Sequence, residues 1–332
     1  MSEARAIACA NVALVKYWGK RDARLNLPAV GSLSLTLGAL QATARVRPAL
    51  EPGAVRFTQD GSRVSGIAEQ RMSRFLDHVA GLAGSERPLG VDVEANFPVG
   101  AGLASSAAIF CATAAAAAAA VGLRLTRREL SGLARLGPGS AARSVFGGFV
   151  EWRRGERSDG SDSIAFQVAD ESAWDVAMAV AVTSDERKSV ASRDAMEHVG
   201  ATSPLFAAWV EAQEPDLEAM RRAIATRDLA RVGTIAEENC LRMHATAIAA
   251  RPPILYWRPA TLAAIVAVQE MRRDGLEAYF TIDAGPQVKA LCRGSDLPAV
   301  RDRLAALPGV RRVLEARPGP GVAMVEGPAP WA

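Results

Sequence analysis

The chain has 332 residues, of which 49% are hydrophobic and 23% are charged. This balance is typical of a folded globular protein and excludes an intrinsically disordered one. The length allows two ordinary domains or one large α/β unit. The net charge of +3 is too small to indicate a nucleic-acid-binding protein.

The four cysteines lie far apart, with no CxxC pair and no neighbouring histidine pair. We therefore expect reduced, mostly buried thiols in a cytoplasmic protein rather than disulfides or a zinc site. The N-terminus lacks the basic region and long apolar core of a secretory signal. The longest apolar stretch, residues 111–123, is too short to span a bilayer, so no membrane role is indicated.

The first half of the chain reads mainly as strands. Apolar and partly alternating patterns predict strands over residues 7–15, 42–47, 55–58 and 89–97. Helical spacing predicts a helix over residues 71–83, and an alanine-rich helix is expected to begin near Ser105. Residues 147–153 and 163–168 flank the polar turn RRGERSDGSD and predict a hairpin.

Long helical patterns dominate the second half. They cover residues 203–225, 229–249 and 261–274. Strands are predicted over residues 175–182, 278–283, 288–292 and 322–326. This is an α+β pattern. The change from strand-rich to helix-rich sequence places a domain boundary near residue 175, with units 1–175 and 176–332.

Residues 98–108, PVGAGLASSAA, are the most informative local segment. Gly100 and Gly102 allow backbone amides to approach a ligand with no Cβ in the way. Ser105 and Ser106 then begin a helix, whose unpaired N–H groups and positive dipole end favour an anion, most naturally phosphate. A serine-capped helix after a tight turn is the alternative. The segment is neither a Walker P-loop nor a complete GxGxxG motif.

Residues 11–22, NVALVKYWGKRD, gather two lysines, an arginine and two aromatic rings. The segment reads as a strand edge that leads into a solvated basic turn, or as a phosphate site. The second interpretation depends on the aromatic neighbours, because partly desolvated lysines bind phosphate more strongly than exposed ones.

Two further segments, GPGSAARSVFGG and YFTIDAGP, carry an arginine and an aspartate in distinctive settings. In the first, Ser140 and Arg143 share one helix face. An arginine fork can grip a carboxylate, although Arg143 could also cap a helix or form a surface ion pair. In the second, Asp283 ends a β-branched and aromatic strand, where it could simply cap a turn.

Together these motifs resemble the GHMP kinase superfamily and, within it, the diphosphomevalonate decarboxylase family. PxGxGLASSAA is similar to the ATP-phosphate loop of the superfamily, and its GLASS form resembles the decarboxylase branch. The run ANVALVKYWGKRD is similar to the family's N-terminal signature, and the runs FGGFVEW and FTIDAGP match further family segments. The resemblance extends over residues 10–326, with the motifs in matching order.

The resemblance implies an α+β GHMP kinase fold. It implies an N-terminal ribosomal-protein-S5-like α/β domain, a C-terminal ferredoxin-like domain and an active site in the cleft between them. It also implies ATP and Mg²⁺ as cofactors, a homodimer, and ATP-dependent decarboxylation of mevalonate 5-diphosphate to isopentenyl diphosphate.

The same resemblance implies residue roles. Lys16 lies at the reacting centre, Arg143 holds the mevalonate carboxylate, and Asp283 positions and can deprotonate the tertiary hydroxyl. The residues implied at the phosphate end of the substrate are Tyr17, Lys20, Ser140 and Arg193. The residues implied for ATP are Gly100, Gly102, Leu103, Ala104, Ser105 and Ser106, of which Ser105 also helps to hold Mg²⁺. His244 is expected to be a helix-packing residue.

Three positions depart from the family pattern. Val30 and Gly31 stand in place of the first two residues of an Asn-Ser-Ser run, and Pro138 stands in place of a serine near the phosphate end of the substrate. Proline offers neither a hydroxyl nor an N–H. This loss leaves two related activities open, a phosphomevalonate decarboxylase and a mevalonate 3-kinase. An inactive GHMP-fold regulator is disfavoured, because the glycine loop and Asp283 are both present.

Overall fold

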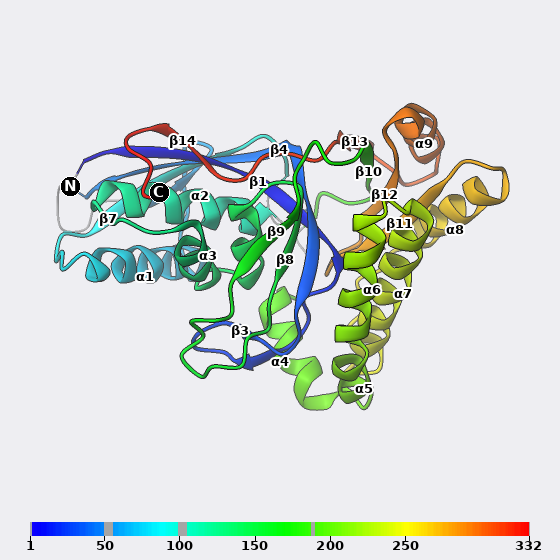
Figure 1. Cartoon of the computed structure of the whole chain (residues 1–332), viewed down its shortest axis with the longest axis horizontal. Helices are drawn as coiled ribbons and strands as arrows, with labels where there is room; N and C mark the ends of the chain where they lie inside the picture. The colour runs from blue at the N-terminus through cyan, green and yellow to red at the C-terminus, as the bar shows by residue number, and fades with distance from the viewer. Residues whose placement is uncertain (1, 50–55, 99–104, 187–189, 332) are drawn as a thin grey trace.

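The computed structural model describes residues 2–49, 56–98, 105–186 and 190–331. Within these ranges the chain forms two large, mostly antiparallel sheets with helices packed against them, and one two-stranded sheet (Figure 1). The α+β class expected from the sequence is confirmed. No helix in these ranges is long and apolar enough to cross a bilayer.

The larger sheet contains eight strands in the described part of the chain. Six follow the spatial order β14 (Ala323–Glu326), β1 (Ala4–Val15), β4 (Ser32–Pro48), β7 (Leu89–Ala95), β5 (Phe57–Gln59) and β6 (Ser62–Arg63). The hairpin of β8 (Phe149–Trp152) and β9 (Ala165–Ala169) extends the sheet from β4, as predicted. The sequence predicts only residues 42–47 of β4, because Ser32, Ser34 and Thr36 are residue types common in loops; the structure buries all three.

Helix α2 (Ser105–Ala120) packs directly on β1 and β4. Its alanines have no bulk beyond Cβ, so the helix can lie close to the sheet along its whole length. Helices α1 (Ile67–Leu82) and α3 (Arg127–Arg135) flank α2, and the short 3₁₀ helix η1 (Gly139–Val145) follows α3. Helix α3 was not predicted from the sequence, although Thr126 and Glu129 form a capping box at its start.

The smaller sheet has the spatial order β11 (Ala278–Ile282), β12 (Val288–Arg293), β10 (Val176–Val182) and β13 (Arg312–Ala316). Its covering elements are α7 (Leu229–Ile248), α8 (Pro259–Arg273), η2 (Gly294–Asp296) and α9 (Leu297–Ala305). In chain order the unit runs strand, helices, strand, strand, helix, strand, which is the ferredoxin-like arrangement. Neither α9 nor β13 was predicted.

Helices α4 (Ser192–Thr202), α5 (Phe206–Glu211) and α6 (Gln213–Ala225) all contact α7. Helix α4 also contacts the short strand β2 (Lys20–Asp22), which pairs with β3 (Leu27–Pro28). The sequence predicts one helix over residues 203–225 and does not predict α4. The single-helix prediction is wrong, because the chain breaks between α5 and α6. Pro215 lacks an N–H and clashes with the carbonyl group four residues earlier, which ends the preceding helix.

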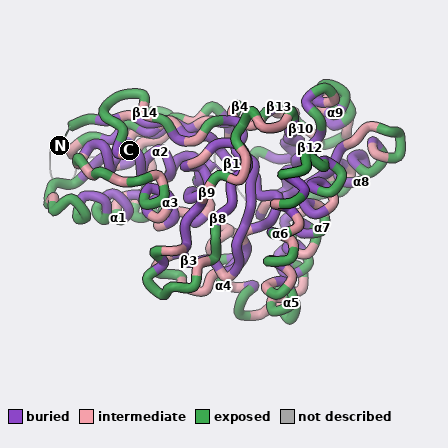
Figure 2. The backbone as a smooth tube through the Cα atoms, viewed as in Figure 1, coloured by how far each residue is buried: buried purple, intermediate pink, exposed green. Residues whose placement is uncertain are grey.

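The buried core is continuous across both halves of the chain. One apolar cluster includes Leu35 of β4, Ala112 of α2, Met178 of β10 and Val232 of α7. Figure 2 shows buried backbone running through the middle of the molecule, with exposed residues on its outer helices. Strand β14, from the end of the chain, pairs with β1 in the larger sheet. The division near residue 175 therefore does not separate the strands cleanly by sheet.

Candidate active site

A cavity of about 1190 Å³ is lined by residues of β1, α1, α2, η1 and α4 and of the loop after β11. Eight of its described lining side chains are basic and one is acidic: Lys16, Lys20, Arg24, Arg63, Arg71, Arg74, Arg143 and Arg193, against Asp283. Such an excess of positive charge favours an anionic ligand.

The cavity gathers all the predicted site residues that the structure describes. These are Lys16, Tyr17, Lys20, Ser105, Ser106, Ser140, Arg143, Arg193 and Asp283. Gly100, Gly102, Leu103 and Ala104 of the predicted phosphate loop lie outside the described residues. Segments up to 267 residues apart in the chain thus meet at one site.

An ion pair between Lys16 and Asp283 connects the end of β1 with the end of β11. Nζ of Lys16 donates to Oδ1 of Asp283 at 2.8 Å and to the carbonyl oxygen of Ala13 at 2.7 Å. Nζ of Lys289, on β12, lies 3.1 Å from Oδ2 of the same carboxylate. Both lysine side chains are buried, whereas the side chain of Asp283 is 23% exposed and lines the cavity.

These two lysines control the ionisation of Asp283. Burial alone raises the pKa of Asp283, but the charges of Lys16 and Lys289 outweigh burial and hold the pKa well below its ordinary range. Asp283 is therefore a carboxylate at neutral pH.

The backbone of Lys16 is held from the helical half of the molecule. Its N–H donates to Oδ1 of Asn239 at 2.8 Å, and its carbonyl oxygen accepts from Nε2 of Gln213 at 2.6 Å. Nδ2 of Asn239 in turn donates to Oε1 of Gln213 at 2.8 Å. Gln213 is the first residue of α6, so the break before this helix brings its amide to Lys16.

Arg143 is buried, and its side chain donates hydrogen bonds to two neutral side chains. Its Nε donates to Oδ1 of Asn11 at 3.1 Å, and its Nη1 donates to Oγ of Ser32 at 2.7 Å. No carboxylate among the described residues forms an ion pair with Arg143, although its side chain lines the cavity. Burial lowers the pKa of its guanidinium to about 10, so Arg143 remains charged at neutral pH. This arrangement suits an incoming carboxylate.

A second basic group surrounds Lys20. Nζ of Lys20 is buried and lies 3.6 Å from Oε1 of Glu197 on α4. Burial, and then the nearby charge of Arg193, lower the pKa of Lys20. Nη2 of Arg193 donates to the carbonyl oxygen of Gly137 at 3.4 Å. The hydroxyl of Tyr17 is buried with no hydrogen-bond partner in the described part of the protein. Polar donors therefore converge here with few acceptors.

Ser105 and Ser106 begin α2 and line the same cavity. The N–H groups of a helix's first turn have no partner within the helix, so this end of α2 suits a phosphate group. Among the described residues, no group of three His, Cys, Asp or Glu side chains could hold a metal ion. The hydroxyl groups of Ser105 and Ser106 fit Mg²⁺ that is held largely by phosphate oxygens and water.

Two of the three departures from the family pattern point away from the cavity. Val30 is 2% exposed and packs in the apolar cluster around Trp18. A Cβ on Gly31 would lie 2.7 Å from Cδ1 of Leu217. Neither position is among the lining residues, whereas Pro138, at the start of η1, is one of them. Only Pro138 can alter contacts with a ligand directly.

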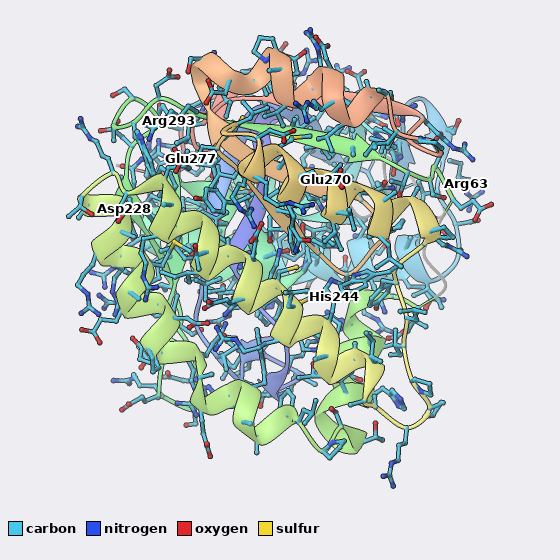
Figure 3. The ribbon with its side chains drawn as sticks, turned by 90° about the vertical axis from the view of Figure 1, so that its right-hand side faces the viewer. Arg63, Asp228, His244, Glu270, Glu277 and Arg293 are labelled. Atoms are coloured by element: carbon cyan, nitrogen blue, oxygen red, sulfur yellow. The ribbon has the colours of Figure 1, made fainter. Side chains whose placement is uncertain are left out.

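His244, on α7, is confirmed as a helix-packing residue. It is buried, and its ring lies 6.3 Å from that of Tyr256 and 5.0 Å from that of Trp257. Burial lowers its pKa to about 3, so the imidazole is neutral at neutral pH. Its label in Figure 3 marks its place on the long helix that faces the viewer.

Sequence reasoning missed several residues of the site, and five of them are informative. Asn11 and Ser32 orient Arg143, Lys289 pairs with Asp283, and Arg71 and Arg74 line the cavity from α1. A signal existed for Lys289, which is the one charged residue within the apolar run VKALC. The spacing of Arg71 and Arg74 places both on one helix face, but nothing in the sequence says which face meets the cavity.

Family models match most of the chain. Residues 8–165 match the diphosphomevalonate decarboxylase-like N-terminal domain, and residues 178–313 match the mevalonate 5-diphosphate decarboxylase C-terminal domain. The chain is 36% identical over 318 residues to the diphosphomevalonate decarboxylase of Aspergillus fumigatus, covering 90% of this chain and 79% of that protein.

Solved structures of the same family also resemble this chain closely. The mevalonate diphosphate decarboxylase from Enterococcus faecalis has a TM-score of 0.90 and 35% identity, covering 98% of this chain and 99% of that one. A structure described as MDDEF in complex with MVAPP, AMPPCP and magnesium has a TM-score of 0.92 and 36% identity over the same shares. The chain therefore belongs to the diphosphomevalonate decarboxylase family of the GHMP kinase superfamily.

Proposed function

We propose that this chain catalyses the ATP-dependent decarboxylation of mevalonate 5-diphosphate to isopentenyl diphosphate, with release of ADP, phosphate and CO₂. The observation that carries the proposal is the meeting of Lys16, Asp283 and Arg143 in one basic cavity. The reaction needs a group beside the tertiary hydroxyl, a holder for the carboxylate and cationic sites for phosphates, and the cavity offers all three.

Asp283 is assigned to the tertiary hydroxyl of the substrate. Its carboxylate is the one acidic group among the described lining residues and remains ionised at neutral pH. A carboxylate with so low a pKa is a weak base, so its main role is to orient the hydroxyl, and it accepts the proton late in the reaction. Lys16 stabilises the negative charge that develops beside it.

Arg143 is assigned to the carboxylate that departs as CO₂. Its guanidinium is buried, charged and oriented by Asn11 and Ser32, and no described carboxylate neutralises it. A guanidinium held in this way fixes the carboxylate in one direction, which aligns the bond to be broken.

Tyr17, Lys20, Ser140 and Arg193 are assigned to the diphosphate. Lys20 has Arg193 and Arg71 as charged neighbours and Glu197 as its ion-pair partner. This cationic excess favours a phosphorylated substrate over unphosphorylated mevalonate.

ATP supplies the phosphoryl group that makes the tertiary hydroxyl a leaving group. The first turn of α2, with Ser105 and Ser106, is assigned to its phosphates, together with Gly100, Gly102, Leu103 and Ala104. Ser105 is assigned to Mg²⁺ through its hydroxyl, consistent with a metal held mainly by phosphate oxygens.

The test is to measure ADP, phosphate and CO₂ with Mg²⁺-ATP and each of three substrates: mevalonate, its 5-phosphate and its 5-diphosphate. We expect all three products from the diphosphate, and Asp283→Asn should abolish them. CO₂ mainly from the monophosphate would instead assign phosphomevalonate decarboxylase, and would implicate Pro138. ADP without CO₂ would make the chain a 3-kinase.

We also propose a homodimer in the cytoplasm. Exposed apolar side chains on α7 and α8, among them Leu241, Ile248, Leu262 and Val266, support a subunit contact. The four cysteines are free and buried, which supports a reducing compartment. Light scattering after size-exclusion chromatography tests the dimer, because a mass of one chain would contradict it.

We propose, finally, that the chain divides near residue 175 into units 1–175 and 176–332. The change from a strand-rich to a helix-rich half supports this division. Limited proteolysis tests it, because early cleavage should fall near this position.

A further inference from the structure

Lys289 is a buried cation beside the proposed reacting centre. It lies on β12, its side chain is 0% exposed, and its Nζ lies 3.1 Å from Oδ2 of Asp283. It is absent from the residues that line the cavity, whereas Lys16 and Asp283 are present. Among the described residues, the ion pair with Asp283 is the contact that leads from Lys289 to the cavity.

The carboxylate of Asp283 is shared by two buried lysines. Lys16 already pairs with Asp283 at 2.8 Å, so its charge is balanced without Lys289. A second buried ammonium adds a further desolvation cost. The group of two lysines and one aspartate carries an excess positive charge in a buried position.

On the basis of the proposed function, we infer that Lys289 is a positioning residue: it holds Oδ2 of Asp283 while Lys16 holds Oδ1, and so fixes the direction in which the carboxylate meets the substrate hydroxyl. The terminal torsion of an aspartate is otherwise broad. Contacts to both oxygens, one from the residue after β1 and one from β12, restrict it.

The strand register explains the placement. Thr281 pairs with Lys289, and Ile282 pairs with Val288, in the antiparallel ladder of β11 and β12. Asp283 is the first residue beyond β11, where the ladder no longer constrains it. Lys289 lies inside β12 and is rigidly held, so it can anchor a side chain that belongs to a turn.

Other ionisable groups also surround Asp283. They come from the end of β1, from α7 and from η1, and are Lys16, Cys240, His244 and Arg143. Burial raises the pKa of the Cys240 thiol and lowers the pKa of His244, so both are neutral at neutral pH. Burial lowers the pKa of Lys289, and the negative charge of Asp283 opposes that shift. Among the described residues, Lys16 and Lys289 are the two cations within ion-pair distance of the carboxylate.

The test is Lys289→Met, which keeps the length of the side chain and removes its charge. Asp283 then retains Lys16, and the buried group becomes neutral overall, so folding should be preserved. We expect kcat to fall about 100-fold, the effect of a small misplacement of a catalytic group, with little change in the KM for ATP. Lys289→Arg keeps the positive charge and should recover part of the rate.

The pH profile separates positioning from a purely structural role. The pKa of Asp283 lies well below its ordinary range in the wild-type protein, so protonation of Asp283 should not limit kcat/KM in mild acid. Removal of a neighbouring cation raises the pKa of an aspartate by about 1–3 units, so kcat/KM of Lys289→Met should begin to fall at a higher pH than that of the wild type. A structural defect would lower the rate equally at every pH. Arg221→Met is the matched control: it removes the partner of buried Glu151 away from the cavity, and should leave the acid limb unchanged.

A double-mutant cycle with Asp283→Asn completes the test. If Lys289 acts through Asp283, adding Lys289→Met to Asp283→Asn should change the residual rate by less than about threefold. If the two substitutions lower the rate by factors that multiply in the double mutant, the inference is overturned. An acid limb of kcat/KM that is unchanged in Lys289→Met would also overturn it.

A measurement without turnover keeps this inference separate from the proposed function. The carboxyl pKa of Asp283, read from the carbon NMR signal that Asp283→Asn removes, should rise in Lys289→Met. If the wild-type protein is inactive but the pKa of Asp283 still rises in Lys289→Met, only the proposed function is contradicted. If the wild-type protein is active but the pKa of Asp283 does not rise in Lys289→Met, only the role of Lys289 is contradicted.

Discussion

Ser32→Ala tests whether Arg143 must be held in place to work. Oγ of Ser32 accepts a hydrogen bond from Nη1 of Arg143 at 2.7 Å, and Ser32 is 0% exposed. The substitution removes this acceptor and leaves part of a buried guanidinium without a partner. Nε of Arg143 keeps its bond to Asn11, so the side chain should stay in the site but with less defined orientation.

The magnitude follows from the kind of bond that is lost. A hydrogen bond to a charged group contributes about 1.5–3 kcal/mol. If that energy is used to orient the carboxylate of the substrate, kcat/KM should fall by about 10- to 150-fold, because 1.4 kcal/mol corresponds to a factor of ten. The free energy of unfolding should fall by a similar amount.

Ser34→Ala is the matched control. Ser34 lies two residues further along β4 and is also 0% exposed, but its Oγ has no hydrogen-bond partner among the described residues. Removal of an unpaired buried hydroxyl relieves a desolvation cost, so stability should be unchanged or should rise. The assays are urea unfolding and steady-state kinetics with the diphosphate substrate.

Two results would refute this reasoning. Equal losses of stability in Ser32→Ala and Ser34→Ala would mean that the effect comes from packing rather than from the bond to Arg143. A loss of stability in Ser32→Ala with unchanged kcat/KM would mean that Arg143 does not meet the substrate.

Three further predictions concern stability and reactivity. Gly233→Ala should lower the free energy of unfolding, measured in urea, by about 1–3 kcal/mol, because the added Cβ would lie 1.9 Å from Cγ of Tyr279. Gly132→Ala is the control: its Cβ meets open space, so the free energy of unfolding should rise by about 0.5–1 kcal/mol. The pKa of His244 is lowered to about 3 in the folded protein, so below about pH 6.5 the unfolded chain binds a proton that the folded protein does not. The free energy of unfolding should therefore fall by up to about 1.4 kcal/mol per pH unit as the pH is lowered from 6.5 to 3. Acid titrations of unfolding should lose this part of the slope in His244→Phe. Burial raises the pKa of all four cysteine thiols, so an aromatic disulfide reagent should react with none of them until denaturant is added, and rapid reaction of a native thiol would contradict their burial.

The sequence predicted the elements that carry a clear period. Strands β1, β7, β10, β11 and β12 and helices α2, α7 and α8 lie close to their predicted ranges. The elements it missed have weak local signals. Helix α9 is short and contains proline in its first turn, and β13 pairs only with a strand far away in the sequence. Pairing over such distances is not visible in a local pattern.

Site residues that belong to a recognisable motif could be predicted from the sequence. Site residues that reach the cavity only because of the fold could not. Motifs indicated Lys16, Arg143 and Asp283, and the structure brings all three to one cavity. The roles of Ser32 and Lys289 depend on which strands are neighbours, which no spacing along the chain reveals. The sequence shows that positions 30 and 31 depart from the family pattern but not which way they face. Both positions face the core, because side-chain direction is set by packing rather than by nearness to a motif.

Strand β14 has a consequence for synthesis on the ribosome. It pairs with the outer edge of β1, although more than 300 residues separate Ala6 from its partner Met324. During translation, β1 therefore waits with an unpaired edge until residues 323–326 have been made. Unpaired strand edges recruit other strands and cause aggregation. Nascent chains that stall before residue 323 should accordingly depend on chaperones more than chains that already contain β14.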